Sequence, residues 1–222
     1  QHRGICMPED CERYKRELAE MLSWADGVQV RLHENYVSWN GDHGDHALKT
    51  DLCRKYLFPL TLEVMARPEF KGKYLGAYLE EAYINHFNGP VLGQHGTETL
   101  RTFLDEAMLQ SPDVFVGFEW NEANENTSFQ PTLSGAGTTA RIISYYKAKI
   151  NHEPLKPRPG DDVSVPNLIL STRQTMRLGE NFHVELLYVP DGVATDPFQA
   201  RVVMRDISGK ALVQFPWEGL PT

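Results

Sequence analysis

Residues 114–125 read Val-Phe-Val-Gly-Phe-Glu-Trp-Asn-Glu-Ala-Asn-Glu, an apolar run followed at once by a cluster of acid and amide side chains. The apolar run predicts a strand from Asp113 to Phe118. Barrel enzymes keep their catalytic groups at the carboxyl ends of such strands. The stretch therefore predicts an α/β fold whose candidate site begins where this strand ends.

The two glutamates after this strand, Glu122 and Glu125, are three residues apart. Carboxylates so placed in a turning segment can converge on one sugar-sized volume. Repulsion between two close carboxylates favours a state in which one is protonated and the other ionised. Such a pair can supply both the acid and the base of a reaction, so we predict both residues as catalytic.

The spacing around these glutamates resembles a known motif. In the endo-α-mannosidase family (glycoside hydrolase family 99) and its polysaccharide-associated relatives, the last barrel strand ends in Asn-Glu-x-x-Glu, with a proline six residues after the second Glu. These places are held here by Asn121, Glu122, Glu125 and Pro131, with Trp120 at the aromatic position before the Asn. A helix with Tyr145 and Tyr146, expected over residues 138–150, also resembles the helix that comes after the motif in the family.

The resemblance implies a retaining glycoside hydrolase that acts on a polysaccharide or glycan such as an α-mannoside. Retention would proceed through the sugar's own 2-hydroxyl group, with Glu122 as the base on that hydroxyl and Glu125 as the acid/base at the leaving oxygen. The family usually has Trp-His between the glutamates and Gly after the second, where this chain has Ala123-Asn124 and Asn126. These differences favour an alternative, a non-catalytic carbohydrate-binding or surface-polysaccharide assembly protein with a barrel-like fold. In a third interpretation the cluster only caps a strand.

Helix and strand patterns alternate before the motif, which predicts parallel strands with helices outside. The expected elements are a helix from about 10 to 25, a strand from 28 to 32, a helical stretch interrupted at Pro59 and Pro68, a helix from about 73 to 87, a short strand at 90–93 and a helix from 97 to 108. A closed eight-stranded barrel needs roughly 200 to 250 residues. We therefore expect residues 1–150 to be the carboxyl-terminal part of a (β/α)8 TIM-type barrel, with the missing amino-terminal part of the same barrel as its partner. A small self-sufficient α/β domain is the alternative.

Residues 151–162 hold three prolines and predict a stiff linker between two domains. Residues 163–222 then show short β runs separated by turns that contain Gly, Asp or Pro, which predicts an antiparallel β-sandwich. The runs cover 167–171, 182–189, 199–206 and 211–215. No paired carboxylates follow a strand in this region, so we expect it to contribute no catalytic group.

A further set of side chains is predicted to bind the glycan: Glu34, Asn35, Tyr36, Trp39, His95, Trp120 and Asn121. Glu34 and Asn35 come after the first predicted strand, and a strand-end polar cap is the alternative for Glu34. Tyr36 and Trp39 offer flat apolar faces on which a pyranose can stack, with a core role as the alternative. His95 comes after the short strand and could donate a hydrogen bond to a sugar hydroxyl.

Composition limits the class of ligand. The formal net charge is −8, from 22 basic and 30 acidic residues, and the basic residues form no clustered stripe. This balance argues against a nucleic-acid partner. No apolar stretch approaches the roughly 20 residues that span a bilayer, so we predict no membrane insertion. The polysaccharide resemblance leads us to expect a glycan substrate and an extracellular or periplasmic location.

We predict neither a metal nor another cofactor. The segment Asp42–His46 has oxygen and imidazole ligands, but a solvated loop is the favoured interpretation. Cys6, Cys11 and Cys53 are too few for a disulfide framework. One bridge with a spare thiol and three free thiols remain as alternatives.

Overall fold

The computed structural model describes residues 8–30, 53–84, 91–92, 95–117, 119–122, 127–132, 135, 137–172, 178–193 and 197–220. The chain divides into two compact units, Gln1–Gln130 and Pro131–Thr222. The division falls before the helix at 138–150, whereas the predicted linker was 151–162. The two units are described separately.

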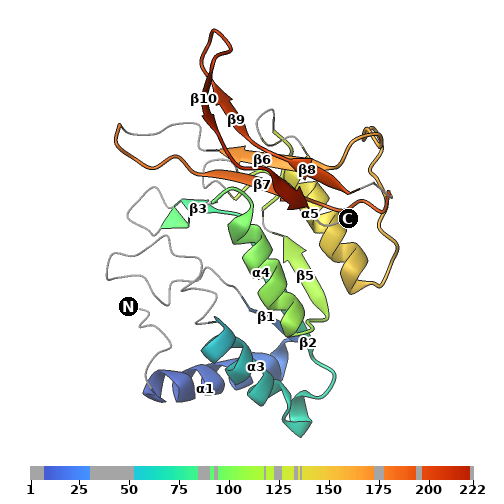
Figure 1. The fold of residues 1–222 in the computed structure, drawn as a ribbon. Coiled ribbons are helices and arrows are strands. Elements are labelled where there is room, and N and C mark those ends of the chain that lie inside the picture. The colour runs from blue at the N-terminus through green and yellow to red at the C-terminus, as the bar shows by residue number, and fades with distance from the viewer. Residues whose placement is uncertain are drawn as a thin grey trace. The chain divides into compact units, whose positions relative to one another are not determined.

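The first unit contains helices and short strands in alternation (Figure 1). Its elements are α1 (Pro8–Trp24), β1 (Gly27–Val30), the π-helical turn η1 (Cys53–Leu57), α3 (Phe58–Met65), the 3₁₀ turn η2 (Pro68–Phe70), β2 (Tyr74–Leu79), β3 (Tyr83–Ile84), β4 (Val91–Leu92), α4 (Glu98–Leu109) and β5 (Val114–Gly117).

Strands β1, β2 and β5 form a parallel sheet in that order. Their spatial order is also their order in the chain, so the connections advance in one direction, as they do in the wall of a barrel. The close approach of β1 to β2 requires glycine at its start, because a Cβ on Gly27 would lie 2.5 Å from the carbonyl oxygen of Tyr74. The order is compatible with part of a barrel, which stays a prediction.

The central strand β2 corrects the sequence analysis, which predicted a helix over residues 73–87. Residues 75–79 are all buried, so the strand shows no alternation of apolar and polar side chains. Leu75, Tyr78 and Leu79 stand at helical spacing, and a strand buried on both faces has this same continuous apolar pattern. Pairing with a strand on each side, which no local pattern reveals, decides the outcome.

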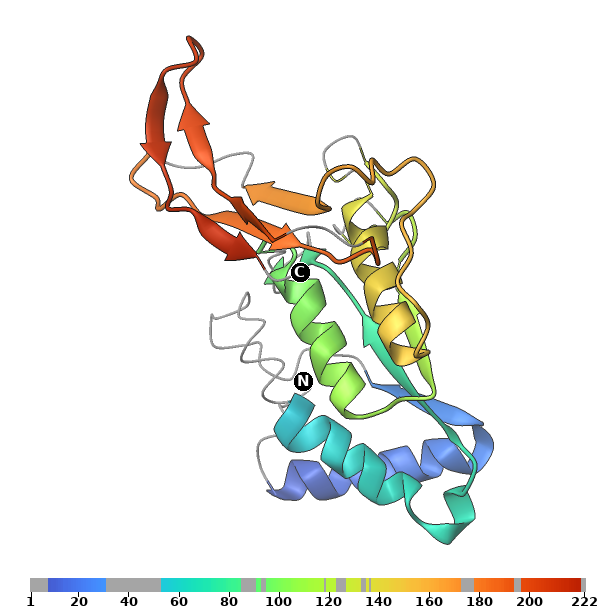
Figure 2. The ribbon, with the colours of Figure 1, turned by 45° about the vertical axis from the view of Figure 1, so that its right-hand side comes forward.

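One face of the sheet packs against the helices. Phe103 of α4 and Phe58 of α3 are fully buried and form one cluster with Val30 of β1 and Leu75 of β2. Both views show α4 alongside the sheet strands (Figures 1 and 2). The apolar stripe of α4 therefore faces the sheet, as its spacing predicts.

Most other elements of this unit agree with the sequence analysis. Helices α1 and α4 and strands β1 and β5 coincide with predicted elements, and Pro59 stands in the first turn of α3, where its missing N–H costs nothing. The strand predicted at 90–93 contains β4, which pairs antiparallel with β3 outside the parallel sheet.

The second unit contains one helix followed by short strands. Its elements are α5 (Thr138–Ile150), β6 (Leu168–Thr172), β7 (Val184–Tyr188), β8 (Phe198–Ala200), β9 (Val203–Arg205), β10 (Ala211–Gln214) and β11 (Glu218–Leu220). The helix predicted at 138–150 is confirmed as α5. The predicted strand at 199–206 is divided into β8 and β9.

All strand pairs described in this unit are antiparallel: β6 with β7, β9 with β10, and β8 with β11. The β9–β10 pair forms a hairpin that extends away from α5 in both views (Figures 1 and 2). The packing of two sheets as a sandwich stays a prediction.

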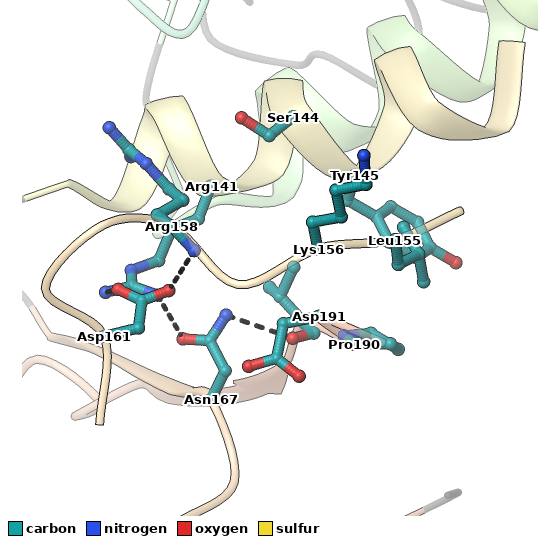
Figure 3. A pocket seen from close by; sticks show the side chains of 11 residues that line it. Arg141, Ser144, Tyr145, Leu155, Lys156, Arg158, Asp161, Asn167, Pro190 and Asp191 are labelled. Carbon is teal, nitrogen blue, oxygen red and sulfur yellow. Dashed lines mark hydrogen bonds and ion pairs between the residues drawn. The ribbon is translucent and has the colours of Figure 1, made fainter. Parts of the chain in front are cut away.

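A partly buried ion pair fastens the segment 151–162 to helix α5 (Figure 3). The guanidinium of Arg141 binds both carboxylate oxygens of Asp161, one through Nη2 and the other through Nη1 at 2.8 Å. Nη1 also donates to Asn167 Oδ1 at 3.0 Å, and the amide of Asn167 donates to the carbonyl of Val189 at 3.1 Å. These bonds join helix, segment and strand ends within the second unit.

We predict that the packing of α4 stabilises the first unit. Phe103→Ala should lower the free energy of unfolding by about 3–5 kcal/mol, because it leaves a cavity between the helix and the sheet. Leu109→Ala on the same helix is the matched control, since the Leu109 side chain is 72% exposed. Urea unfolding followed by circular dichroism measures both. Equal losses in the two variants would contradict this packing.

We also predict that Asp161 makes the second unit sensitive to acid. The hydrogen bond from Arg141 lowers the pKa of Asp161 below its usual value. The ionised Asp161 carboxylate therefore stabilises the folded state above the unfolded pKa of about 3.9. This stabilisation is lost as the pH falls through the lower pKa of the folded state. Asp161→Asn should lower the free energy of unfolding by about 1.5–3 kcal/mol at pH 7. In this variant the free energy of unfolding should also decrease less as the pH falls.

The exposed Glu218 supplies a control for this experiment. Glu218→Gln should leave the urea midpoint of unfolding unchanged at pH 7. The decrease of this midpoint at acid pH should also be unchanged. Urea titrations at several pH values between about 2 and 7, which span the usual carboxyl range, decide the matter. An acid profile of Asp161→Asn that matches the unaltered protein would refute the assignment.

Candidate active site

The parallel sheet brings three strand ends to one edge. Val30 of β1 pairs with Ala77 of β2, and Leu79, the last residue of β2, pairs with Gly117, the last residue of β5. The motif segment 119–122 comes after β5 in the chain, and Glu80 comes directly after β2. This carboxyl edge carries the acidic groups of the candidate site.

Backbone hydrogen bonds fasten the motif segment to residues 127–130. The N–H of Glu119 donates to the carbonyl of Thr127 at 3.1 Å, and the N–H of Phe129 donates to the carbonyl of Glu119 at 3.0 Å. The carbonyl of Trp120 accepts bonds from the N–H of Gln130 and the hydroxyl of Ser128. These bonds fasten Glu119 and Trp120, just before the motif, to residues 127–130.

Thr127 belongs to the motif turn, which comprises residues 119–122 together with residues 127–130. Its N–H and its hydroxyl donate to the carbonyl of Glu122 at 3.2 and 3.3 Å, and the residue is buried. The side chain of Glu122 is half-buried, while Glu125 lies outside the described residues. These bonds join Glu122 to Thr127 on the two sides of residues 123–126, and the convergence of Glu122 and Glu125 stays a prediction.

Gly117 and Phe129 join this turn to the strand. A Cβ on Gly117 would lie 3.5 Å from the ring of Phe129, which is buried. The ring therefore packs against the last residue of β5. The motif turn rests on an apolar contact as well as on hydrogen bonds.

Trp120 and Asn121 are both exposed, with Trp120 at 66%. An exposed indole next to the acidic cluster presents a flat apolar face to solvent. Pyranose rings pack on such faces, and polar side chains beside them can bind the hydroxyls. The structure thus leaves the two predicted binding residues after β5 accessible.

The other predicted binding residues belong to two further segments. Glu34, Asn35, Tyr36 and Trp39 lie outside the described residues, although the strand that precedes them ends at the carboxyl edge. His95 is exposed, and its φ of 48° is one that few residues other than glycine adopt.

His95 comes after β4, which is not a strand of the parallel sheet. It precedes α4, however, and α4 carries the chain from the carboxyl end of β2 back to the start of β5. The first turn of α4 therefore begins on the side of the carboxyl edge (Figure 1). A role for His95 in binding stays a prediction.

The sequence analysis missed Glu80, which is 1% exposed and stands directly after β2. With residues 73–87 interpreted as a helix, Glu80 was only one position on a helix face. The signal that could have found it is the apolar run 74–79 followed at once by an acidic residue, as the run 114–118 is followed by Glu119.

Among the residues that the structure describes, no three His, Cys, Asp or Glu side chains come together as a metal site, and segment 42–46 lies outside them. Cys11 is a half-buried free thiol beside the Val30 cluster, and Cys6 is not described. No described helix is long and apolar enough to span a bilayer.

Two groups of polar side chains in the second unit have structural partners. Figure 3 shows a small cavity beside α5 that includes Arg141, Asp161 and Asn167, all engaged in the bonds that fasten segment 151–162 to the helix. Asp206 accepts bonds from Ser208 and Lys210 in the β9–β10 turn, and the bond from the Ser208 hydroxyl is the main reason that the pKa of Asp206 is lowered. These groups stabilise turns and strand ends.

Comparison with protein-family models, with curated proteins and with solved structures found no match to this chain.

Proposed function

We propose that the chain carries the active site of a glycoside hydrolase at the carboxyl edge of its parallel sheet. One observation carries the proposal: the Asn-Glu-x-x-Glu motif begins at Asn121, shortly after β5 ends at Gly117, in a sheet whose parallel strands succeed one another as in a barrel wall. Barrel enzymes keep their chemistry at this edge. The substrate would be a polysaccharide or glycan, and the motif resemblance points to an α-mannoside.

The proposed chemistry needs a base and an acid. Glu122 takes the proton of the sugar's 2-hydroxyl as that oxygen attacks the anomeric carbon, while Glu125 gives its proton to the leaving oxygen. Glu125 then takes a proton from the water that attacks the anomeric carbon, and Glu122 returns its proton to the 2-oxygen. The anomeric configuration is retained without the covalent carboxylate intermediate of ordinary retaining enzymes.

A second candidate function is glycan binding without turnover. The observation that favours it is Ala123-Asn124 between the two glutamates, where the resembling family has Trp-His. The same edge would then bind the sugar through Trp120 and Asn121 without cleaving it. Saturable binding of α-mannans with no product after long incubation would select this function over hydrolysis.

The first test of the site replaces each glutamate by its amide. Glu125→Gln and Glu122→Gln should each lower kcat by about 10²- to 10⁴-fold, because the amide keeps the shape but cannot transfer the proton. Binding of the same sugar should be largely retained. Turnover of α-mannan oligosaccharides with a poor leaving group, together with calorimetric binding, measures both quantities.

Glu119→Gln is the matched control, because Glu119 belongs to the same turn and is joined to it through backbone hydrogen bonds that the substitution leaves in place. This variant should keep its turnover. Full activity of Glu125→Gln on a substrate with a poor leaving group would sink the assignment of the acid. A wild-type protein that binds no sugar, with no rise in Tm, would favour the structural interpretation of the cluster.

We further predict that Trp120 is a stacking platform. Trp120→Ala should weaken binding of the oligosaccharide by about 3- to 10-fold with little change in Tm, since the side chain is exposed. Trp24→Ala is the control: Trp24 is 75% exposed but ends α1, directly before β1 and thus at the opposite edge of the sheet. Equal affinities in the two variants, measured by calorimetry, would contradict the platform.

A further inference from the structure

Glu80 is a buried carboxylate at the centre of the carboxyl edge. It stands directly after Leu79, the last residue of β2, and β2 lies between β1 and β5 in the sheet. Leu79 pairs with Gly117. The segment with Glu80 and the segment with the motif therefore both follow this one pair of residues. The register alone therefore brings Glu80 to the level at which the motif turn starts.

The alternation of side chains along β2, continued by one residue, assigns Glu80 to the face of the sheet away from the helices. Side chains alternate along a strand, so Glu80 shares a face with Gly76 and Tyr78, opposite to Leu75. Leu75 is the residue of β2 that packs with Phe103 of α4. In a barrel, the face opposite the helices is the inner one, and side chains at its carboxyl end reach the active site.

A second buried glutamate, Glu106, supplies a control for experiments on Glu80. Glu106 of α4 is also 1% exposed, and its Oε2 accepts bonds from Nε and Nη2 of Arg54, both at 2.7 Å. This ion pair offsets the cost of burying the carboxylate, which amounts to several kcal/mol for an ion removed from water. Glu106 thus has a structural role in the helix layer, away from the carboxyl edge.

We propose that Glu80 is a substrate-binding carboxylate of the site, which accepts hydrogen bonds from the hydroxyl groups of the pyranose and sets its position relative to Glu122. The inference rests on the proposed function and adds a third acidic group to it. A carboxylate accepts hydroxyl hydrogen bonds that are stronger than those between neutral groups. A site that binds a hydroxyl in this way rejects analogues that lack it, so Glu80 would also determine specificity.

The test compares Glu80→Gln with Glu106→Gln in the whole chain, using α-mannan oligosaccharides as the probe. Glu80→Gln should raise KM by about 10- to 100-fold, with a smaller change in kcat and a Tm within about 2 °C of the unaltered protein. Glu106→Gln should lower Tm by about 5 °C or more, because it breaks the pair with Arg54, and should leave KM unchanged.

The outcomes separate this inference from the proposed function. An unchanged KM in Glu80→Gln would refute the binding role while leaving the hydrolase in place. A Tm loss equal to that of Glu106→Gln would show a structural role and would refute it equally. A wild-type protein inert toward every oligosaccharide and unable to bind any would overturn both proposals. Loss of kcat with unchanged KM would place Glu80 in proton transfer and would also contradict a binding role.

Discussion

The parallel pairing of β2 with β1 on one side and β5 on the other is the constraint on which the first unit depends. Parallel strands cannot be joined by tight turns, so each connection must return across the sheet, and here α3 and α4 lie in those connections. Parallel pairing also sends all three carboxyl ends to one edge. The hydrogen bonds that stabilise the sheet thus also bring the segments that carry its acidic groups to the same edge.

The helix layer stabilises this pairing. Phe58 and Phe103 belong to one buried cluster with Val30, the last residue of β1, and Leu75, near the start of β2. At about 25 cal/mol for each Å² of apolar surface removed from water, such rings contribute strongly to folding. The residues after the strands lie outside this cluster, which explains why polar groups can gather there without weakening the core.

Local sequence patterns predicted elements that have one apolar face and one polar face. They failed for an element that is buried on both faces. Helix α4 has one apolar stripe and was predicted from spacing, whereas helix α5 was expected from the resemblance of the motif region. Strand β2 is buried on both faces, and nothing within residues 74–79 distinguishes it from a buried helix. The error carried over to the site: the motif after β5 could be found by its spacing, whereas Glu80 acquires meaning only once β2 is known to be a strand.

Precision of the motif turn is the last requirement for the proposed chemistry. Catalytic groups must be held within about 0.5 Å of their working positions, and loops meet this demand only when their backbone is fixed. Here Thr127 binds the carbonyl of Glu122 through two donors, and Phe129 packs on Gly117 at the strand end. These contacts use backbone atoms and apolar surface, so they hold the turn without drawing on the carboxylate of Glu122. A turn built in this way can place its acidic side chains accurately and still leave their oxygens to the substrate.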